Sequence, residues 1–314
     1  MTYSITNTMS AKAWAMLILL SIIWGGSFFF IGTAVSELPP LTIVALRVGI
    51  ATIVLWGIVF MVGLRPPKDP NVWLAFLGMG LLNNVIPFAL IVWGQTQIAS
   101  GLAAILNASA PIFAVVVAGL LLPDERPTPL KLVGVCIAFI GVVVIIGVPA
   151  MNGEGNLLPQ LAVVAAALFY AFGGVYGRRF KTLRVDPIVT AAGQVTGSTI
   201  ILLPITLVID GPIDLMATSS HVWAAITALA VLSTAIAYVL YFKILDLAGA
   251  TNVLLVTLLV PVSAVLLGCA FLNESLGWVH LAGMLLIALG LSAIDGRLWQ
   301  RMKPTQVKPL TSKL

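Results

Sequence analysis

Ten long apolar stretches make up most of this chain of 314 residues. Each holds about 20 residues or more, which as an α-helix is enough to cross the hydrocarbon core of a bilayer. Short joints rich in Pro and Gly, such as "SELPPL" and "DGPID", separate them. The pattern therefore predicts ten transmembrane helices, at about 12–34, 40–63, 72–94, 98–122, 129–148, 158–177, 187–209, 221–243, 249–272 and 278–295.

The composition supports the same fold class. Hydrophobic residues make up 60% of the chain, charged residues make up only 9%, and the mean hydropathy is +1.11. A soluble protein carries about 25% charged residues and could not hide so much apolar surface. We therefore expect an all-α integral membrane protein, in contact with membrane lipid.

The basic residues lie on one side of the predicted spans. If the N-terminus is in the cytoplasm, 15 of the 16 Lys and Arg fall in cytoplasmic joints or tails, and the outer joints hold none. This asymmetry follows the positive-inside rule and predicts that both termini are cytoplasmic. It accounts for the net charge of +5 without nucleic acid as a partner. Cys136 and Cys269 lie within apolar stretches, and we expect buried thiols there.

The chain contains a repeat of five helices. "ASGLAAILNASAPIFAVVVAGLLLPDE", from Ala99, is matched by "AGATNVLLVTLLVPVSAVLLGCAFLNE", from Ala248, at an offset of 149 to 150 residues. Because five is odd, the second half must enter the membrane in the opposite direction. We predict two inverted repeats, at 11–150 and 157–297, followed by a basic cytoplasmic tail at 298–314. In alternating-access transporters with inverted repeats, the substrate site lies between the halves near the midplane.

Pairs of glycines occupy matching places in the last span of each repeat. Gly134 and Gly141 are seven residues apart, and so are their equivalents Gly283 and Gly290. This spacing puts both glycines of a pair on one helix face, where they allow another helix to approach closely. We expect these faces to be packing surfaces.

The chain resembles the ten-helix EamA branch of the drug/metabolite transporter superfamily. The resemblance lies in the ten spans in two halves, "IIWGGSFFF", Pro40 followed by Arg47, and the Pro-Asp-Glu and Asn-Glu joints. It implies a basket of helices around a central cavity, with the fifth and tenth spans outside. The branch includes bacterial exporters of amino acids, aromatic ones among them, and of related metabolites. The resemblance thus implies a bacterial inner-membrane location.

Polar residues precede prolines in the middle of three spans. A helix proline removes the hydrogen bond to the carbonyl four residues earlier, and each of those earlier residues has a polar side chain. The prolines are Pro87, Pro111 and Pro261, and the polar residues are Asn83, Asn107 and Thr257. Such groups either hold helices together or line a water-filled cavity. We favour a cavity for the set, because polarity recurs at matched depths in both halves.

Helical spacing extends this set to aromatic residues. Asn84 and Phe88 share a helix face, as do their repeat equivalents Thr234 and Tyr238. Aromatic walls with a few amides suit an amphiphilic ligand. The candidate substrate-binding residues are Trp24, Ser27, Phe28, Asn83, Asn84, Phe88, Asn107, Tyr170, Thr234, Tyr238, Tyr241 and Thr257.

Arg47 is the one basic residue that lies inside a predicted span away from its ends. Two roles are open for it. It can bind a substrate carboxylate, or it can hold the structure by capping carbonyls or by pairing with Glu37 or Glu274. Gln194 takes its place in the second half, which fits either role.

The absence of certain residues narrows the function further. No Asp or Glu lies in the middle of a predicted span, whereas proton-coupled pumps usually keep a carboxylate in the pathway. No phosphate-binding glycine loop and no metal or cofactor signature is present. We expect a secondary transporter that exports small amphiphilic metabolites, with amino acids the best guess and with weak proton dependence. The alternatives are a multidrug exporter of organic cations, a membrane enzyme or a helical scaffold. The oligomeric state stays open, with a monomer among the options.

Overall fold

The computed structural model describes residues 10–123, 128–151, 156–248 and 256–295, and throughout these residues the regular structure is helical. The first half contains α1 (Ala11–Ala34), α2 (Pro40–Met61), α3 (Pro70–Gly80), η1 (Leu81–Val85), α4 (Ile86–Gln95), α5 (Ser100–Asn107), α6 (Ala110–Leu121) and α7 (Pro129–Met151). The second half contains α8 (Leu157–Gly177), α9 (Arg179–Thr182), α10 (Pro187–Ile209), α11 (Ser220–Ala230), η2 (Val231–Ile236), α12 (Ala237–Ala248), α14 (Val256–Phe271) and α15 (Trp278–Asp295).

The predicted ten spans are confirmed in these helices. Seven helical stretches of the described chain are long and apolar enough to cross a membrane. Three shorter apolar stretches, at Pro129–Ile145, Leu259–Phe271 and Trp278–Ile294, supply the remainder. Several spans begin at a proline, for example α2 at Pro40 and α10 at Pro187, because the first helical position needs no N–H donor.

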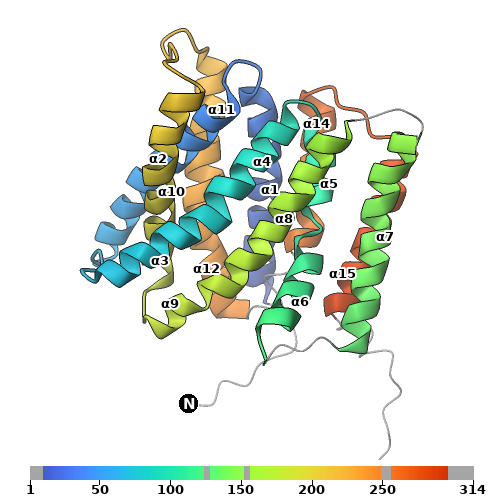
Figure 1. Cartoon of the computed structure of the whole chain (residues 1–314), viewed down its shortest axis with the longest axis horizontal. Helices are drawn as coiled ribbons and strands as arrows, with labels where there is room; N and C mark the ends of the chain where they lie inside the picture. The colour runs from blue at the N-terminus through green and yellow to red at the C-terminus, as the bar shows by residue number, and fades with distance from the viewer. Residues whose placement is uncertain (1–9, 124–127, 152–155, 249–255, 296–314) are drawn as a thin grey trace, which may run out of the picture.

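The last spans of the two halves cross each other in opposite directions. Gly134 on α7 faces Gly290 on α15, and Gly141 faces Gly283. A Cβ added at Gly134 would lie 2.6 Å from the carbonyl oxygen of Gly290, so only glycine allows this approach. The residue number rises along one helix as it falls along the other, which makes the pair antiparallel. α7 and α15 stand together at one edge of the bundle (Figure 1).

The second spans of the two halves form a similar antiparallel pair. The hydroxyl of Thr42 on α2 donates to Asp210 Oδ2 at 2.7 Å, at the end of α10. Further along α2, Trp56 Nε1 donates to Thr196 Oγ1 at 2.8 Å. Contacts elsewhere also occur in symmetric pairs: α1 packs on α14 as α8 packs on α6, and α4 packs on α8 as α12 packs on α1. The chain is therefore an inverted repeat of five helices, as the residue offset predicts.

The third span of each half is interrupted by a π-helix at the same depth. η1 occupies Leu81–Val85 and η2 occupies Val231–Ile236. Pro87 follows η1, but Ala237 stands at the equivalent place after η2. The wide turn therefore does not depend on proline. In the fourth span, α5 ends at Asn107 and α6 begins at Ala110, just before Pro111, whereas Pro261 lies inside α14 without ending it.

The outer surface of the bundle is apolar, as a surface facing lipid must be. Met61 and Val208 are 79% and 83% exposed. Cys136 on α7 and Cys269 on α14 are exposed as well, so the expectation of buried thiols is wrong. Hydrophobicity along a membrane helix does not separate the lipid-facing side from the core, because both are apolar.

Candidate functional site

The adjacent amides of η1 reach across to the second half of the chain. Asn84 has no exposed surface. Its Nδ2 donates to Ser198 Oγ on α10 at 3.0 Å, and its Oδ1 accepts from the hydroxyl of Tyr238 on α12 at 3.0 Å. Both ends of the amide are thus hydrogen-bonded within the protein. An unpaired amide buried in an apolar span would be costly, and these hydrogen bonds remove that cost.

Asn83 lies beside Asn84 but is only half-buried. Its Nδ2 donates to Gln194 Oε1 at 3.2 Å and lies 3.5 Å from the hydroxyl oxygen of Tyr238. Tyr238 therefore links the two amides. Both asparagines lie in the π-helix η1, where the helix is wider than an α-helix. Each of them contacts one residue of α10 and also Tyr238 of α12.

Arg47 on α2 meets the same region from the other side. It is buried, with 6% of its surface exposed. Its Nε donates to Thr234 Oγ1 in η2 at 2.9 Å, and its guanidinium carbon lies 3.7 Å from the ring centroid of Phe88. A cation over a ring face in a desolvated place is a favourable contact. Tyr170 on α8 is half-buried and packs against the hydrophobic core of the bundle.

The sequence left open a pairing of Arg47 with Glu37 or Glu274, and the structure does not contain it. Glu37 accepts hydrogen bonds from Ser219, and Glu274 accepts them from the backbone at the start of α5. Among the described residues, Arg47 thus has a hydroxyl and a ring as its partners and no carboxylate.

Aromatic candidates from α1 and α12 contact each other near this region. The rings of Trp24 and Tyr241 have centroids 5.8 Å apart. The hydroxyl of Ser27 donates to the carbonyl oxygen of Trp24 at 2.6 Å, so its hydrogen bond stays within α1. Phe28 is buried, and its carbonyl accepts from Gln95 Nε2 at 2.9 Å.

The remaining candidates stand at helix ends. Asn107 is the last residue of α5, and its Oδ1 is buried without a hydrogen-bond partner among the described residues. Thr257 is half-buried in the first turn of α14. The hydrogen bonds of the described chain do not join Asn107 to the network around Arg47.

Sequence reasoning missed two members of the network, Gln194 and Ser198. Both are buried on α10 and bond the amides of η1. A signal was present, because Gln194 is the repeat equivalent of Arg47 and Ser198 follows it by one helical turn. Their partners are more than a hundred residues away in the chain, so only the packing of α10 against α3 and η1 reveals the contacts.

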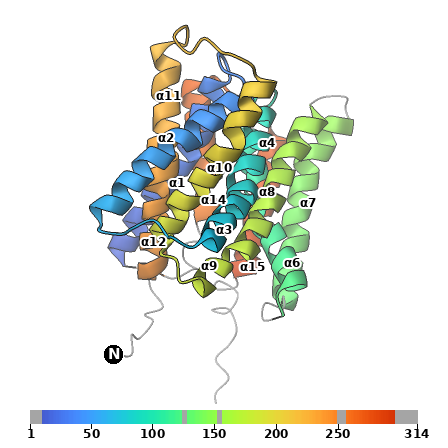
Figure 2. The same ribbon diagram turned by 60° about the vertical axis from the view of Figure 1, so that its left-hand side comes forward.

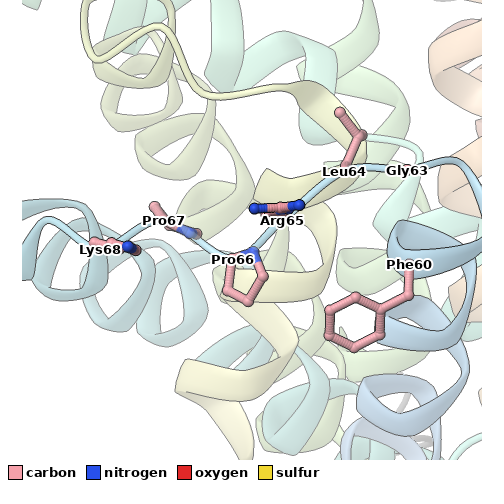
Figure 3. Close-up of a pocket in the computed structure, with 7 residues that line it drawn as sticks. All are labelled: Phe60, Gly63, Leu64, Arg65, Pro66, Pro67 and Lys68. Atoms are coloured by element: carbon pink, nitrogen blue, oxygen red, sulfur yellow. The ribbon is translucent and has the colours of Figure 1, made fainter.

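A cavity of about 670 Å³ lies elsewhere, at the joint between α2 and α3 (Figure 3). Its lining comes from one short stretch, namely Phe60, Gly63, Leu64, Arg65, Pro66, Pro67 and Lys68. Phe60 is 13 positions after Arg47 on α2, which is about 20 Å along a helix. The cavity is thus a feature of the surface joint and does not include the network around Arg47.

An inverted repeat of membrane-spanning helices is the architecture of many secondary transporters. The family model of the EamA-like transporter family matches the chain twice, over residues 11–147 and 157–294. The two matches cover most of the chain and coincide with its two halves. The protein therefore belongs to the EamA-like transporter family, and it is a multi-pass membrane transporter.

Individual relatives agree with this assignment. The chain is 29% identical over 282 residues to an uncharacterized transporter of Archaeoglobus fulgidus, covering 89% of this chain and 97% of the relative. It is 27% identical to the uncharacterized inner membrane transporter YedA of Escherichia coli strain K12, over 87% and 90% of the two chains. A probable amino-acid metabolite efflux pump of the same strain is 25% identical over 93% and 98%.

A solved crystal structure shows the same fold. It superposes with a TM-score of 0.66 at 20% sequence identity, covering 94% of this chain and 99% of the other.

Proposed function

We propose that this transporter exports small amphiphilic metabolites, with amino acids the best candidates, across a bacterial inner membrane by alternating access. Both termini lie in the cytoplasm in this proposal, because the basic joints then face inward. The substrate passes between the inverted halves, where Arg47 meets Thr234 and where the amides of η1 meet α10 and α12. These contacts all cross from one repeat to the other, as expected of a midplane substrate site.

The buried guanidinium of Arg47 is the observation that carries the proposal. A charge in a membrane span is costly, and it is usually neutralised by a partner or used in function. Arg47 has no carboxylate partner among the described residues, and it donates through Nε to Thr234. The two terminal nitrogens of a guanidinium can bind a carboxylate in a bidentate fork. A substrate carboxylate would supply the missing negative charge.

The aromatic residues support an amphiphilic substrate. The ring of Phe88 lies against the guanidinium of Arg47, and the half-buried rings of Trp24 and Tyr241 contact each other. Tyr241 is about one helical turn after Tyr238, which lies beside Asn83. An apolar side chain can rest on the rings while the polar end of the substrate meets Arg47 and Asn83. A buried arginine would repel an organic cation, so export of cationic drugs ranks below export of carboxylates.

Uptake into vesicles that contain the purified protein tests this function. A panel of labelled amino acids, with and without an imposed pH gradient, should reveal substrates that enter faster than into empty vesicles. Because no mid-span carboxylate is present to carry a proton, the gradient should change the rate only weakly. Failure of every amino acid in the panel would contradict the proposed substrate class. Accumulation that a protonophore abolishes would contradict the weak proton dependence.

A further inference from the structure

Three carboxylates at one end of the bundle each bind the N-terminus of a helix in the other half. Their positions are the loop after α1, the end of α10 and the loop after α14, which lie at the end of the bundle opposite to the start of α1 (Figures 1 and 2). We call these contacts the inter-repeat caps. They involve Glu37, Asp210 and Glu274 as acceptors.

The first cap joins Glu37 of the first half to α11 of the second. The hydroxyl of Ser219 donates to Oε1 at 2.7 Å, and its backbone N–H donates to Oε2 at 2.8 Å. Ser219 is the N-cap residue of α11. The hydrogen bond from the Ser219 hydroxyl lowers the pKa of Glu37 below its ordinary value, and the hydrogen bond from the Ser219 backbone N–H lowers it to a smaller degree. The carboxylate therefore stays charged in this contact.

The second cap joins Asp210 of the second half to α2 of the first. Its Oδ2 accepts from the backbone N–H of Thr42 at 2.8 Å and from its hydroxyl at 2.7 Å. Thr42 lies in the first turn of α2. An anion at this position satisfies a free N–H group and also complements the positive end of the helix dipole.

The third cap joins Glu274 of the second half to α5 of the first. Oε1 accepts from the backbone N–H of Ser100 at 2.6 Å, and Oε2 accepts from that of Gly101 at 2.9 Å. Gly268 on α14 leaves the space that this carboxylate occupies, because a Cβ there would collide with Oε2. The contact is therefore built by three elements that come from both halves.

The carboxylates described at the opposite end are used differently. Asp69 accepts from the backbone N–H of Asn71, and Asp186 accepts from that of Ile188. Each of them caps a helix of its own half, α3 or α10. They contribute helix capping without linking the repeats, so they provide a matched comparison.

The charge pattern of the sequence makes the inter-repeat caps stand out further. The joints 35–39, 96–99, 146–156, 210–219 and 272–277 contain no Lys or Arg. The three carboxylates of the inter-repeat caps therefore have helix N-termini as their positive partners. Glu37 is exposed, and Asp210 and Glu274 are half-buried, so water can solvate a released carboxylate and the contacts can open at modest cost.

We propose that the three inter-repeat caps form a latch that holds the transport pathway closed at this end, and that the structure is the state closed there. Opening separates the halves at this end, so each carboxylate must leave its helix N-terminus. The inference rests on the proposed alternating-access function for its purpose. It goes beyond it by naming the residues that close one end and the conformational state that they hold.

Distance measurement between spin labels tests the latch without a substrate. Cys136 and Cys269 are first replaced by Ser, and labels are attached at Thr96→Cys in the first half and at Met216→Cys in the second, both at exposed positions of the latched end. We expect one dominant distance in this background. The triple variant Glu37→Gln, Asp210→Asn, Glu274→Gln should add a population with longer distances.

Two further variants separate a latch from general loss of stability. Gly268→Ala keeps every charge but displaces the carboxylate of Glu274, and should shift the distances in the same direction to a smaller extent. The double variant Asp69→Asn, Asp186→Asn removes the charge of two caps that lie within single halves, and should leave the distances unchanged. An unchanged distance in the triple variant, or an equal shift in the Asp69 and Asp186 variant, would overturn the proposal. Because no substrate is needed, failure of amino-acid uptake would count against the proposed function and not against this result.

Discussion

Asn83 and Asn84 in η1 have different environments, although both are asparagines in the same apolar stretch. Asn84 is fully buried, with its amide satisfied by Ser198 and Tyr238, whereas Asn83 is half-buried beside Gln194. The sequence predicts that both are polar groups at midplane that need a partner or water. It could not separate them, because the difference depends on which side chains α10 and α12 bring across the interface.

Substitution of each asparagine by leucine should give different results. Asn84→Leu leaves the hydroxyls of Ser198 and Tyr238 without this partner, and should lower the free energy of unfolding by about 1–3 kcal/mol. Asn83→Leu should affect stability less, because part of the amide is exposed, and should mainly raise the KM for transport. Melting in detergent and uptake per folded molecule distinguish the two effects. Equal losses of stability for both variants would contradict this division of roles.

At the scale of helices, the hydrophobic pattern predicts the spans and their order but not the turns inside them. The repeat offset predicts that the two halves run in opposite directions, and the glycine spacing predicts a packing face on each last span, but neither predicts that α7 and α15 pack against each other. The π-helices were not predicted. Pro87 indicates a kink in the first half, but η2 forms without a proline, so proline is not required for the wide turn.

Glycine substitutions test the contact between α7 and α15. Gly141→Ala puts a Cβ 2.7 Å from the carbonyl oxygen of Gly283 on rigid backbone, so the helices must separate and the protein should melt at a lower temperature. Gly57→Ala on α2 is the matched control, because nothing lies within 4 Å of the added Cβ. There alanine should be neutral or stabilising by up to about 1 kcal/mol, since it favours a helix over glycine. Similar melting temperatures for the two variants would argue against the packing role of Gly141.

At the scale of the whole molecule, the two halves share a small polar network around Arg47. Carboxylates at one end of the bundle also form hydrogen bonds between the halves. The sequence predicted the inverted repeat, and it identified Arg47, Phe88, Asn83 and Thr234 as candidates. Their contacts span up to 187 residues along the chain, so pattern alone could not pair them. Nor could it tell that Glu37 and Glu274 are engaged elsewhere, because capping of a helix in the other repeat leaves no local signature.

In the proposed function, Arg47 binds the carboxylate of the substrate between the two halves. The most direct test compares an amino acid that is transported with the same amino acid in its carboxamide form, as competitors for uptake by the wild-type protein in vesicles. The acid should compete at least about tenfold better, because loss of a charge-assisted hydrogen bond of about 1.5–3 kcal/mol corresponds to tenfold or more in affinity. In Arg47→Gln, checked for folding by its melting temperature, the preference should disappear. Equal competition by acid and amide in the wild-type protein, or a preference that survives in Arg47→Gln, would contradict this role of Arg47.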